Sequence, residues 1–171
     1  MSPVDKAEIE RKLETEWQAL REVVDSLSDQ ELEEPGVVDE WSVKDLLGHM
    51  AFWANKAAGD LQLVREGRSN DIEVPFLANP EGTGGQNLTD EWNAREADAR
   101  KGRSLSELKS EWETSFAAAK EALKTTPAEN LEIEVKGWDM HTRFAEDTYR
   151  HYREHSAQIR AWKREVETTE E

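Results

Sequence analysis

The segment YRHYREHSAQIRAW (Tyr149–Trp162) has the spacing of an amphipathic helix. In and just before it, large residues recur at steps of three or four: Phe144, Thr148, His151, His155, Ile159 and Trp162. Residues at this spacing share one face of a helix, and that face normally packs against the protein core. The pattern predicts a helix from about residue 142 to 165, with two imidazole rings in its buried stripe.

Three other long segments show the same periodicity. Their apolar stripes run from Ile9 to Leu27, from Val43 to Val64 and from Leu105 to Leu123. Ser42 with Asp45, and Ser104 with Glu107, have the spacing of capping boxes, in which each side chain bonds the other residue's backbone N–H. A shorter helical segment, TDEWNAREADAR (residues 89–100), precedes the third stripe, so we expect the third helix to be broken near Gly102.

Four amphipathic helices predict an all-α four-helix bundle. Residues 67–88 form a long connection between the second and third helices, long enough to cross the bundle. Residues 131–138, LEIEVKGW, alternate in polarity, and only a short extended stretch is expected there. We expect one domain over residues 1–167 and a frayed tail at residues 168–171.

Composition and charge constrain the partners and the location. The chain has 38 acidic and 22 basic residues, for a formal net charge of −16. Such a surface repels phosphate backbones and anionic lipid headgroups, so we expect no nucleic acid partner and no membrane partner. The polar N-terminus does not resemble a signal peptide, and no apolar run approaches the roughly 20 residues that span a bilayer. A cytoplasmic location is therefore expected, with which the absence of cysteine is compatible.

The histidine spacing indicates a candidate metal site. His151 and His155 are four residues apart, so both rings can point at one atom, and His49 on the second stripe is the candidate third ligand. Three neutral histidines leave a coordination position open, as in catalytic metal sites. Asp147 and Asp45 each precede a histidine by one turn and are candidates to orient it or to coordinate. The alternative is a set of buried histidines that only form hydrogen bonds, and His141 is expected at the surface or at a helix cap.

Two segments carry a family resemblance. WSVKDLLGHMAFW (residues 41–53) and DTYRHYREHSAQIRAW (residues 147–162), with LTDEWNAR (residues 88–95) between them, resemble the DinB/YfiT-like superfamily of metalloenzymes. Within it, the likeness is closest to the ClbS/DfsB-like branch of colibactin self-resistance proteins. The resemblance implies an up-down-down-up bundle and a divalent metal held by one histidine of the second helix and the pair on the last. These positions match His49, His151 and His155.

The resemblance also implies chemistry on a small electrophilic molecule. Zinc or nickel is the first candidate for the metal, and the reaction is either hydrolysis or transfer of a thiol. With no cysteine in the chain, a low-molecular-weight thiol would have to be a cosubstrate. Asp45, Tyr149 and Tyr152 are candidate catalytic residues, and Asp147 is the candidate for orienting a ligand. Two alternatives remain open: a protein that binds or sequesters a small molecule without turnover, and a stress protein with a vestigial metal site. A homodimer is compatible with the resemblance.

Overall fold

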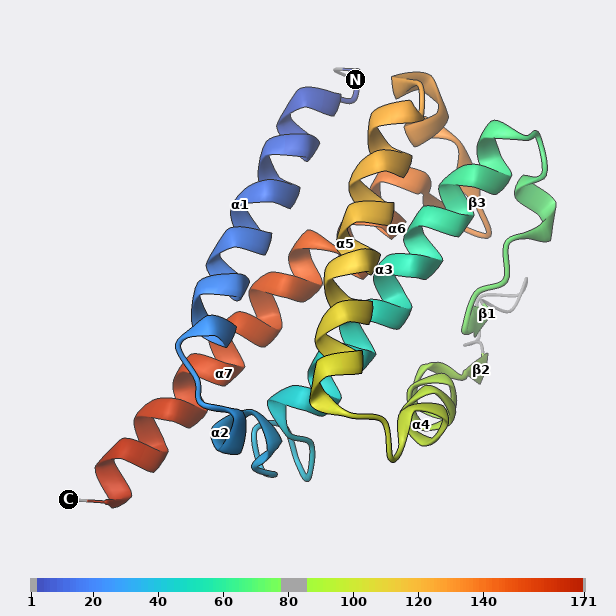
Figure 1. Cartoon of the computed structure of the whole chain (residues 1–171). Helices are drawn as coiled ribbons and strands as arrows, with labels where there is room; N and C mark the ends of the chain where they lie inside the picture. Colours follow the sequence, from blue (N-terminus) through green and yellow to red (C-terminus); the bar gives the residue numbers. More distant parts are fainter. Residues whose placement is uncertain (1–2, 78–85, 171) are drawn as a thin grey trace.

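The computed structural model describes residues 3–77 and 86–170 and shows an up-down-down-up helical bundle. Helices α1 and α7 run in one direction, and helices α3 and α5 run in the opposite direction (Figure 1). α3 packs most extensively on α5, and α1 packs most extensively on α7. The predicted all-α four-helix bundle is confirmed. Its long helices are α1 (Lys6–Asp25), α3 (Val43–Arg65), α5 (Leu105–Thr125) and α7 (Tyr149–Thr169).

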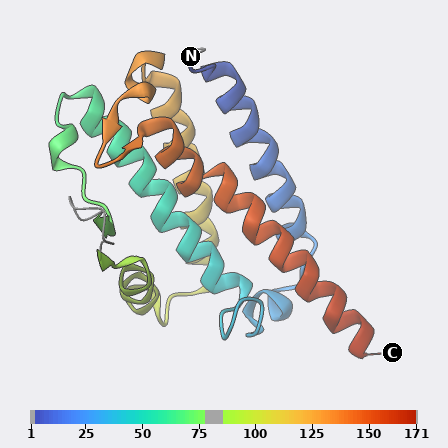
Figure 2. The ribbon, with the colours of Figure 1, turned by 180° about the vertical axis from the view of Figure 1, so that it is seen from behind.

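Short elements connect the long helices. α2 follows α1, and residues 66–77, which follow α3, run back along the bundle, as Figure 2 shows from behind. Two small antiparallel hairpins complete the chain, formed by β1 with β2 and by β3 with β4. The bounds are α2 (Asp29–Glu33), η1 (Ser69–Asp71), β1 (Phe76–Leu77), β2 (Gln86–Asn87), α4 (Thr89–Arg100), η2 (Ala128–Glu132), β3 (Glu134–Val135), β4 (Trp138–Asp139) and α6 (Met140–Asp147). The central part of the predicted long connection, residues 78–85, lies outside the described residues.

The predicted helix starts are confirmed at two positions. Ser42 and Asp45 form a capping box at the start of α3, and Ser104 and Glu107 form another at the start of α5. Such a cap stabilises a helix by about 1 kcal/mol, because it satisfies backbone N–H groups that have no partner inside the helix. The predicted break of the third helix is also found: α4 ends at Arg100, and Gly102 turns the chain with a φ of +85°.

The last helix differs from the prediction, because it is broken at Thr148. This residue has a φ of −126° and a ψ of −97°, and its hydroxyl donates a hydrogen bond of 2.6 Å to the carbonyl oxygen of Phe144. A threonine side chain that bonds the carbonyl four residues back tends to bend a helix. The segment predicted as one helix is therefore two, α6 and α7. α7 also continues to Thr169, two residues into the segment predicted to be frayed.

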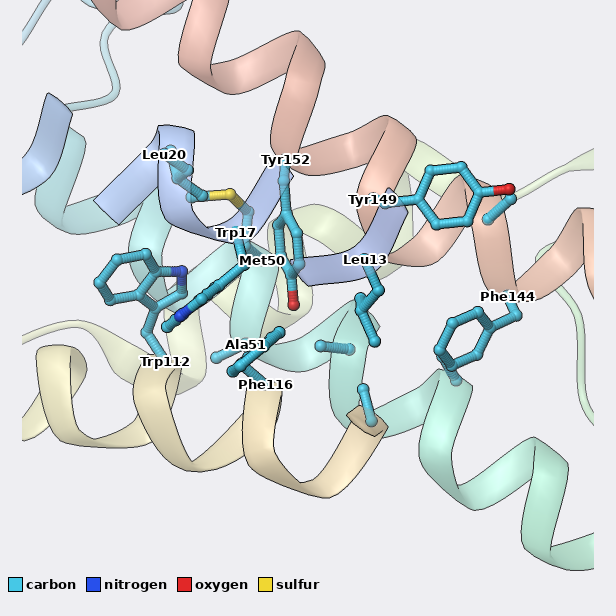
Figure 3. Packing of buried hydrophobic residues seen from close by; sticks show 14 of the residues in the cluster. Leu13, Trp17, Leu20, Met50, Ala51, Trp112, Phe116, Phe144, Tyr149 and Tyr152 are labelled. Atoms are coloured by element: carbon cyan, nitrogen blue, oxygen red, sulfur yellow. The ribbon is translucent and has the colours of Figure 1, made fainter. Parts of the chain in front are cut away.

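Aromatic side chains fill much of the space between α1, α5 and α7. Trp17 of α1 stacks on Phe116 of α5, with ring centroids 4.1 Å apart, and lies edge-on to Tyr152 of α7 at 5.6 Å. Figure 3 shows these rings together with Trp112 and Leu13. This group, called the aromatic core below, accounts for three of the largest fully buried side chains: Trp17, Trp112 and Tyr152.

Among the described residues, no helix is both long and apolar enough to cross a membrane.

Candidate metal centre

Three histidines from two helices meet beside the aromatic core. His49 lies on α3, and His151 and His155 lie one turn apart on α7. The Nε2 atom of His151 lies 2.8 Å from Nε2 of His49 and 2.8 Å from Nε2 of His155. All three ligand atoms lie within 4.8 Å of one another. The structure therefore brings together the three rings that the sequence marked as candidate metal ligands.

The hydrogen bonds of the rings favour a cation between them. Nδ1 of His155 donates to Oε1 of Gln158 at 2.6 Å, which leaves the lone pair on Nε2. His151 Nε2 faces two other ring nitrogens, yet a neutral ring nitrogen carries either one hydrogen or one lone pair, directed one way. It cannot form two well-aligned hydrogen bonds at once. A cation that accepts lone pairs from all three rings removes this conflict.

The local electrostatics keep these rings uncharged. Burial is the main cause that lowers the pKa of His49 to about 3, with smaller contributions from His155 and Arg100. Burial also lowers the pKa of His155, and it lowers the pKa of His151 well below its ordinary value. Neutral imidazole is the form that binds metal ions. The residues present therefore fit a divalent cation in both geometry and protonation.

The three histidines line one part of a cavity of about 450 Å³. One wall is a second stripe of α3, formed by His49, Trp53, Lys56 and Asp60 at steps of four, three and four. The facing wall comes from α6 and α7, with the β3–β4 hairpin and the connection after α3 at the rim. The remaining lining residues are Val74, Pro75, Thr89, Asn93, Lys136, Trp138, Arg143, Glu146, Asp147, His151, Glu154 and His155.

An ion pair and a perturbed carboxyl group lie along the cavity. Lys56 Nζ contacts both carboxylate oxygens of Asp60, at 2.8 and 3.0 Å. Asp147, across the cavity, has a pKa raised to about 8 by burial, which outweighs the opposing effects of Lys56 and Arg143. Asp147 lines the cavity one turn before His151. Its role as a residue that orients His151 stays a prediction. No hydrogen bond joins Asp147 to His151 in the described residues, and Nδ1 of His151 is buried without a partner there.

The structure does not bring the predicted tyrosines to the cluster of His49, His151 and His155. Tyr152 is fully buried in the aromatic core, and Tyr149 forms a hydrogen bond of 3.1 Å with Nε2 of His141. Neither tyrosine lines the cavity. His141 is half-buried, and the residue that caps α6 is Asp139 rather than His141.

Asp45 is occupied at the start of α3. Its carboxylate accepts hydrogen bonds from the backbone N–H and the hydroxyl of Ser42, both at 2.9 Å. It lines a smaller cavity of about 110 Å³ on another side of His49, together with Trp41 and Arg100. A role as a cap accounts for these contacts, and its predicted catalytic role receives no support from them.

Several cavity residues were missed in the sequence. Lys56 and Asp60 continue the spacing of His49 and Trp53, so a search for a second, partly polar stripe on the same helix would have found them. Arg143 and Lys136 belong to α6 and to the turn of the β3–β4 hairpin. No local pattern marks these two residues, because only the packing of the hairpin against the connection after α3 places them at the cavity.

A helical bundle with this order, and with a histidine cluster shared by its second and last long helices, is a DinB/YfiT-like protein. The chain belongs to the mycothiol maleylpyruvate isomerase N-terminal domain family, whose profile matches residues 13–165. The predicted membership of the superfamily is confirmed by this match. A search of curated proteins finds no significant match to the sequence.

Solved structures with the same fold cover nearly the whole chain. An uncharacterised protein from Escherichia coli UTI89 is 16% identical, with a TM-score of 0.77 over 96% of both chains. The sibling lethal factor precursor DfsB is 14% identical, with a TM-score of 0.74 over 96% of this chain and 98% of its own. The colibactin self-resistance protein ClbS, in complex with a dsDNA, is 14% identical, with a TM-score of 0.74 over 94% and 96%. The predicted likeness to ClbS and DfsB is thus confirmed for the fold.

The ClbS complex also corrects one prediction. The net charge of −16 led us to exclude nucleic acid as a partner, but a protein of this fold is solved in complex with dsDNA. That exclusion is wrong. Net charge is a sum over the whole surface, and it does not describe the potential at one local site.

Proposed function

We propose that this protein is a metal-dependent enzyme that detoxifies a small electrophilic molecule, with a divalent cation held by His49, His151 and His155. The observation that carries the proposal is the meeting of three Nε2 atoms in a cavity large enough for a small organic molecule. Zinc or nickel suits three imidazole ligands. The self-resistance role in the name of ClbS, a structural neighbour, supports the direction of this proposal.

The cation would act as a Lewis acid and lower the pKa of a water molecule or of a small thiol. The chain's own residues supply the surroundings. Trp53 and Trp138 offer apolar surface to the body of the substrate, and the helices that carry the histidines hold the rings in a partly buried position. In hydrolysis, the elements of water add across the bond that breaks. In thiol transfer, a carbon–sulfur bond forms as the bond from the electrophilic carbon to its leaving group or ring atom breaks, and the departing atom takes up the proton that the thiol lost. The thiol comes from a cosubstrate because the chain has no cysteine.

Metal content provides the first test, and the chain contains a matched control. Untagged protein is analysed for bound metal before and after chelation, as the wild type and as the His151→Ala and His141→Ala variants. We expect a stoichiometric divalent metal in the wild type and in His141→Ala, since His141 lies outside the cavity, and loss of the metal in His151→Ala. Equal and substoichiometric metal in all three proteins would refute the metal site.

Turnover separates catalysis from sequestration, the second candidate function, which the size of the cavity also permits. The protein is incubated with an excess of an electrophilic cyclopropane or epoxide, with and without a small thiol. An enzyme converts many equivalents per chain, whereas a sequestering protein removes at most one equivalent and releases it intact on denaturation. Recovery of intact compound would favour sequestration.

A further inference from the structure

The cavity extends along α3 to a second end, far from the histidines. His49 and Asp60 both line it and are eleven residues apart on α3, which corresponds to about 16 Å along the helix axis. Arg143 and Lys136 line the cavity as well. Lys136 bonds the carbonyl of Ile72, which follows the end of α3 where Asp60 lies, and Arg143 bonds the carbonyl of Val135 beside Lys136, so both lie near that end. A molecule that fills the cavity therefore meets histidines at one end and basic side chains at the other.

Backbone carbonyl groups, which are uncharged, hold both basic side chains in place. Arg143 Nε donates to the carbonyl oxygen of Val135 at 3.1 Å, and Lys136 Nζ donates to the carbonyl oxygen of Ile72 at 2.6 Å. Within residues 3–77 and 86–170, neither forms an ion pair with a carboxylate, unlike Lys56. Each has further N–H groups beyond these bonds, because an ammonium has three donors and a guanidinium five. The backbone thus fixes two positive charges that, among the described residues, form no ion pair with a carboxylate.

Of the four carboxyl groups that line the cavity, two are paired with other basic side chains, and none forms an ion pair with Lys136 or Arg143 in the described part of the chain. Asp60 is paired with Lys56, and Glu146 is paired with Arg150 at 2.6 Å. Glu154 lies on α7 between the two histidines, and Asp147 lies one turn from Arg143 and one turn from His151. The net charge of the whole protein acts from further away and is screened beyond about 8 Å at physiological ionic strength. The side chains nearest to the far end of the cavity therefore dominate its potential.

Apolar surface lies between the two ends. Trp53, Val74 and Pro75 line the cavity, and Trp138, which is 47% exposed, stands at its rim on β4. Large exposed apolar side chains beside a cavity are typical of ligand-binding sites. A ligand that matches all three parts has a reactive carbon at one end, an apolar body and an anionic group at the other end.

We propose that Lys136 and Arg143 form a carboxylate-binding subsite, which holds an elongated substrate with its apolar body along Trp53 and Trp138 and its reactive carbon at the histidines. This inference extends the proposed function, since both concern the same cavity. Binding of a carboxylate at this end orients the substrate without any metal. It can therefore be tested apart from the metal.

The probe is 2-naphthoate, and its uncharged counterpart is 2-naphthamide. Both are titrated by calorimetry into protein freed of metal by chelation. We expect naphthoate to bind roughly tenfold more tightly than the amide, the effect of about one charge-assisted hydrogen bond. Equal affinities would overturn the subsite.

The decisive variant is Lys136→Asn. Lys136 and Gly137 form the two-residue turn between β3 and β4, with φ of +51° and +90°. Asn-Gly is the most favoured sequence for such a turn, so this variant removes the charge and keeps the hairpin. We expect naphthoate affinity to fall roughly threefold to tenfold, with naphthamide affinity unchanged. Lys124→Gln removes the same charge from the end of α5, outside the cavity, and we expect it to change neither affinity.

Two outcomes separate this inference from the proposed function. If naphthoate is preferred only after zinc is added, and not in His151→Ala, the carboxylate binds at the histidines and the subsite is wrong. If the preference is independent of zinc and is lost in Lys136→Asn, the subsite stands even where the metal proposal fails. A Lys136→Asn protein that binds both probes like the wild type would show that Lys136 only holds the hairpin.

Discussion

Helix α7 borders two interiors that have the same helical spacing and opposite chemistry. Towards α1, Tyr152 packs on Trp17 in the aromatic core, with its ring fully buried (Figure 3). Towards α3, His151 and His155 line a cavity that also contains charged side chains. Neighbouring residues such as His151 and Tyr152 thus belong to different regions, because each step along a helix turns the side chain by about 100°. Burial alone does not identify a functional residue in this protein.

The largest expected effect distinguishes two tryptophans, one in each region. Trp17→Ala removes a fully buried ring from the aromatic core and should lower the free energy of unfolding by about 3–5 kcal/mol. Trp138→Ala removes a ring that is 47% exposed at the cavity rim. This substitution should change the free energy of unfolding by less than about 0.5 kcal/mol. Urea denaturation of both variants measures the difference. Similar losses would show that the cavity rim also supports the fold.

The next effect concerns stabilisation by metal. If the histidines bind zinc, the ion at 100 times its dissociation constant should stabilise the wild type by about 2.7 kcal/mol, because it binds only the folded chain. His151→Leu should abolish this gain, while the metal-free variant should be at least as stable as the metal-free wild type, since an apolar side chain replaces a buried polar one. Thermal unfolding with and without zinc measures both quantities. A marked loss of stability in the metal-free variant would instead indicate that the histidines form a structural hydrogen-bond network.

The comparison of the two regions also explains what could be predicted from the sequence. Local patterns were sufficient for the long helices, for the capping box at Ser42 and for the break near Gly102, because each depends on residues close together in the chain. The same spacing placed His151 and His155 on one face. Tyr149 and Tyr152 are near His151 in the sequence, but successive side chains on a helix point in different directions, so closeness in sequence does not place them at the site.

Other features depend on contacts between distant segments. Lys136 reaches the cavity because its ammonium bonds the carbonyl of Ile72, which is 64 residues away in the chain. The bend at Thr148 depends on the hydrogen bond from its hydroxyl to the carbonyl oxygen of Phe144. Threonine also occurs in straight helices, so the residue type alone does not predict a bend. Neither feature has a local signature that a single sequence would show.

A smaller effect tests the role of Asp45 at the boundary of the cavity. If this residue acts only as a cap, Asp45→Ala and Ser42→Ala should each lower the free energy of unfolding by about 1 kcal/mol. The double variant should cost less than the sum of the two, because both substitutions break the same capping box. Metal content should remain that of the wild type in all three proteins. Loss of metal in Asp45→Ala, with Ser42→Ala unaffected, would restore Asp45 to the site.

The smallest effect is expected from Tyr152→Phe, and it tests the boundary most directly. The hydroxyl of Tyr152 is buried, and no hydrogen-bond partner lies near it in the described part of the chain. Removing a buried hydroxyl without a partner relieves a desolvation cost, so the variant should be as stable as the wild type or more stable by up to about 1 kcal/mol. Turnover and metal content should not change, since the ring faces Trp17 rather than the cavity. A clear loss of turnover in a stable Tyr152→Phe protein would show that the aromatic core and the cavity are not separate, and that the tyrosine reaches the histidines in a conformation other than this one.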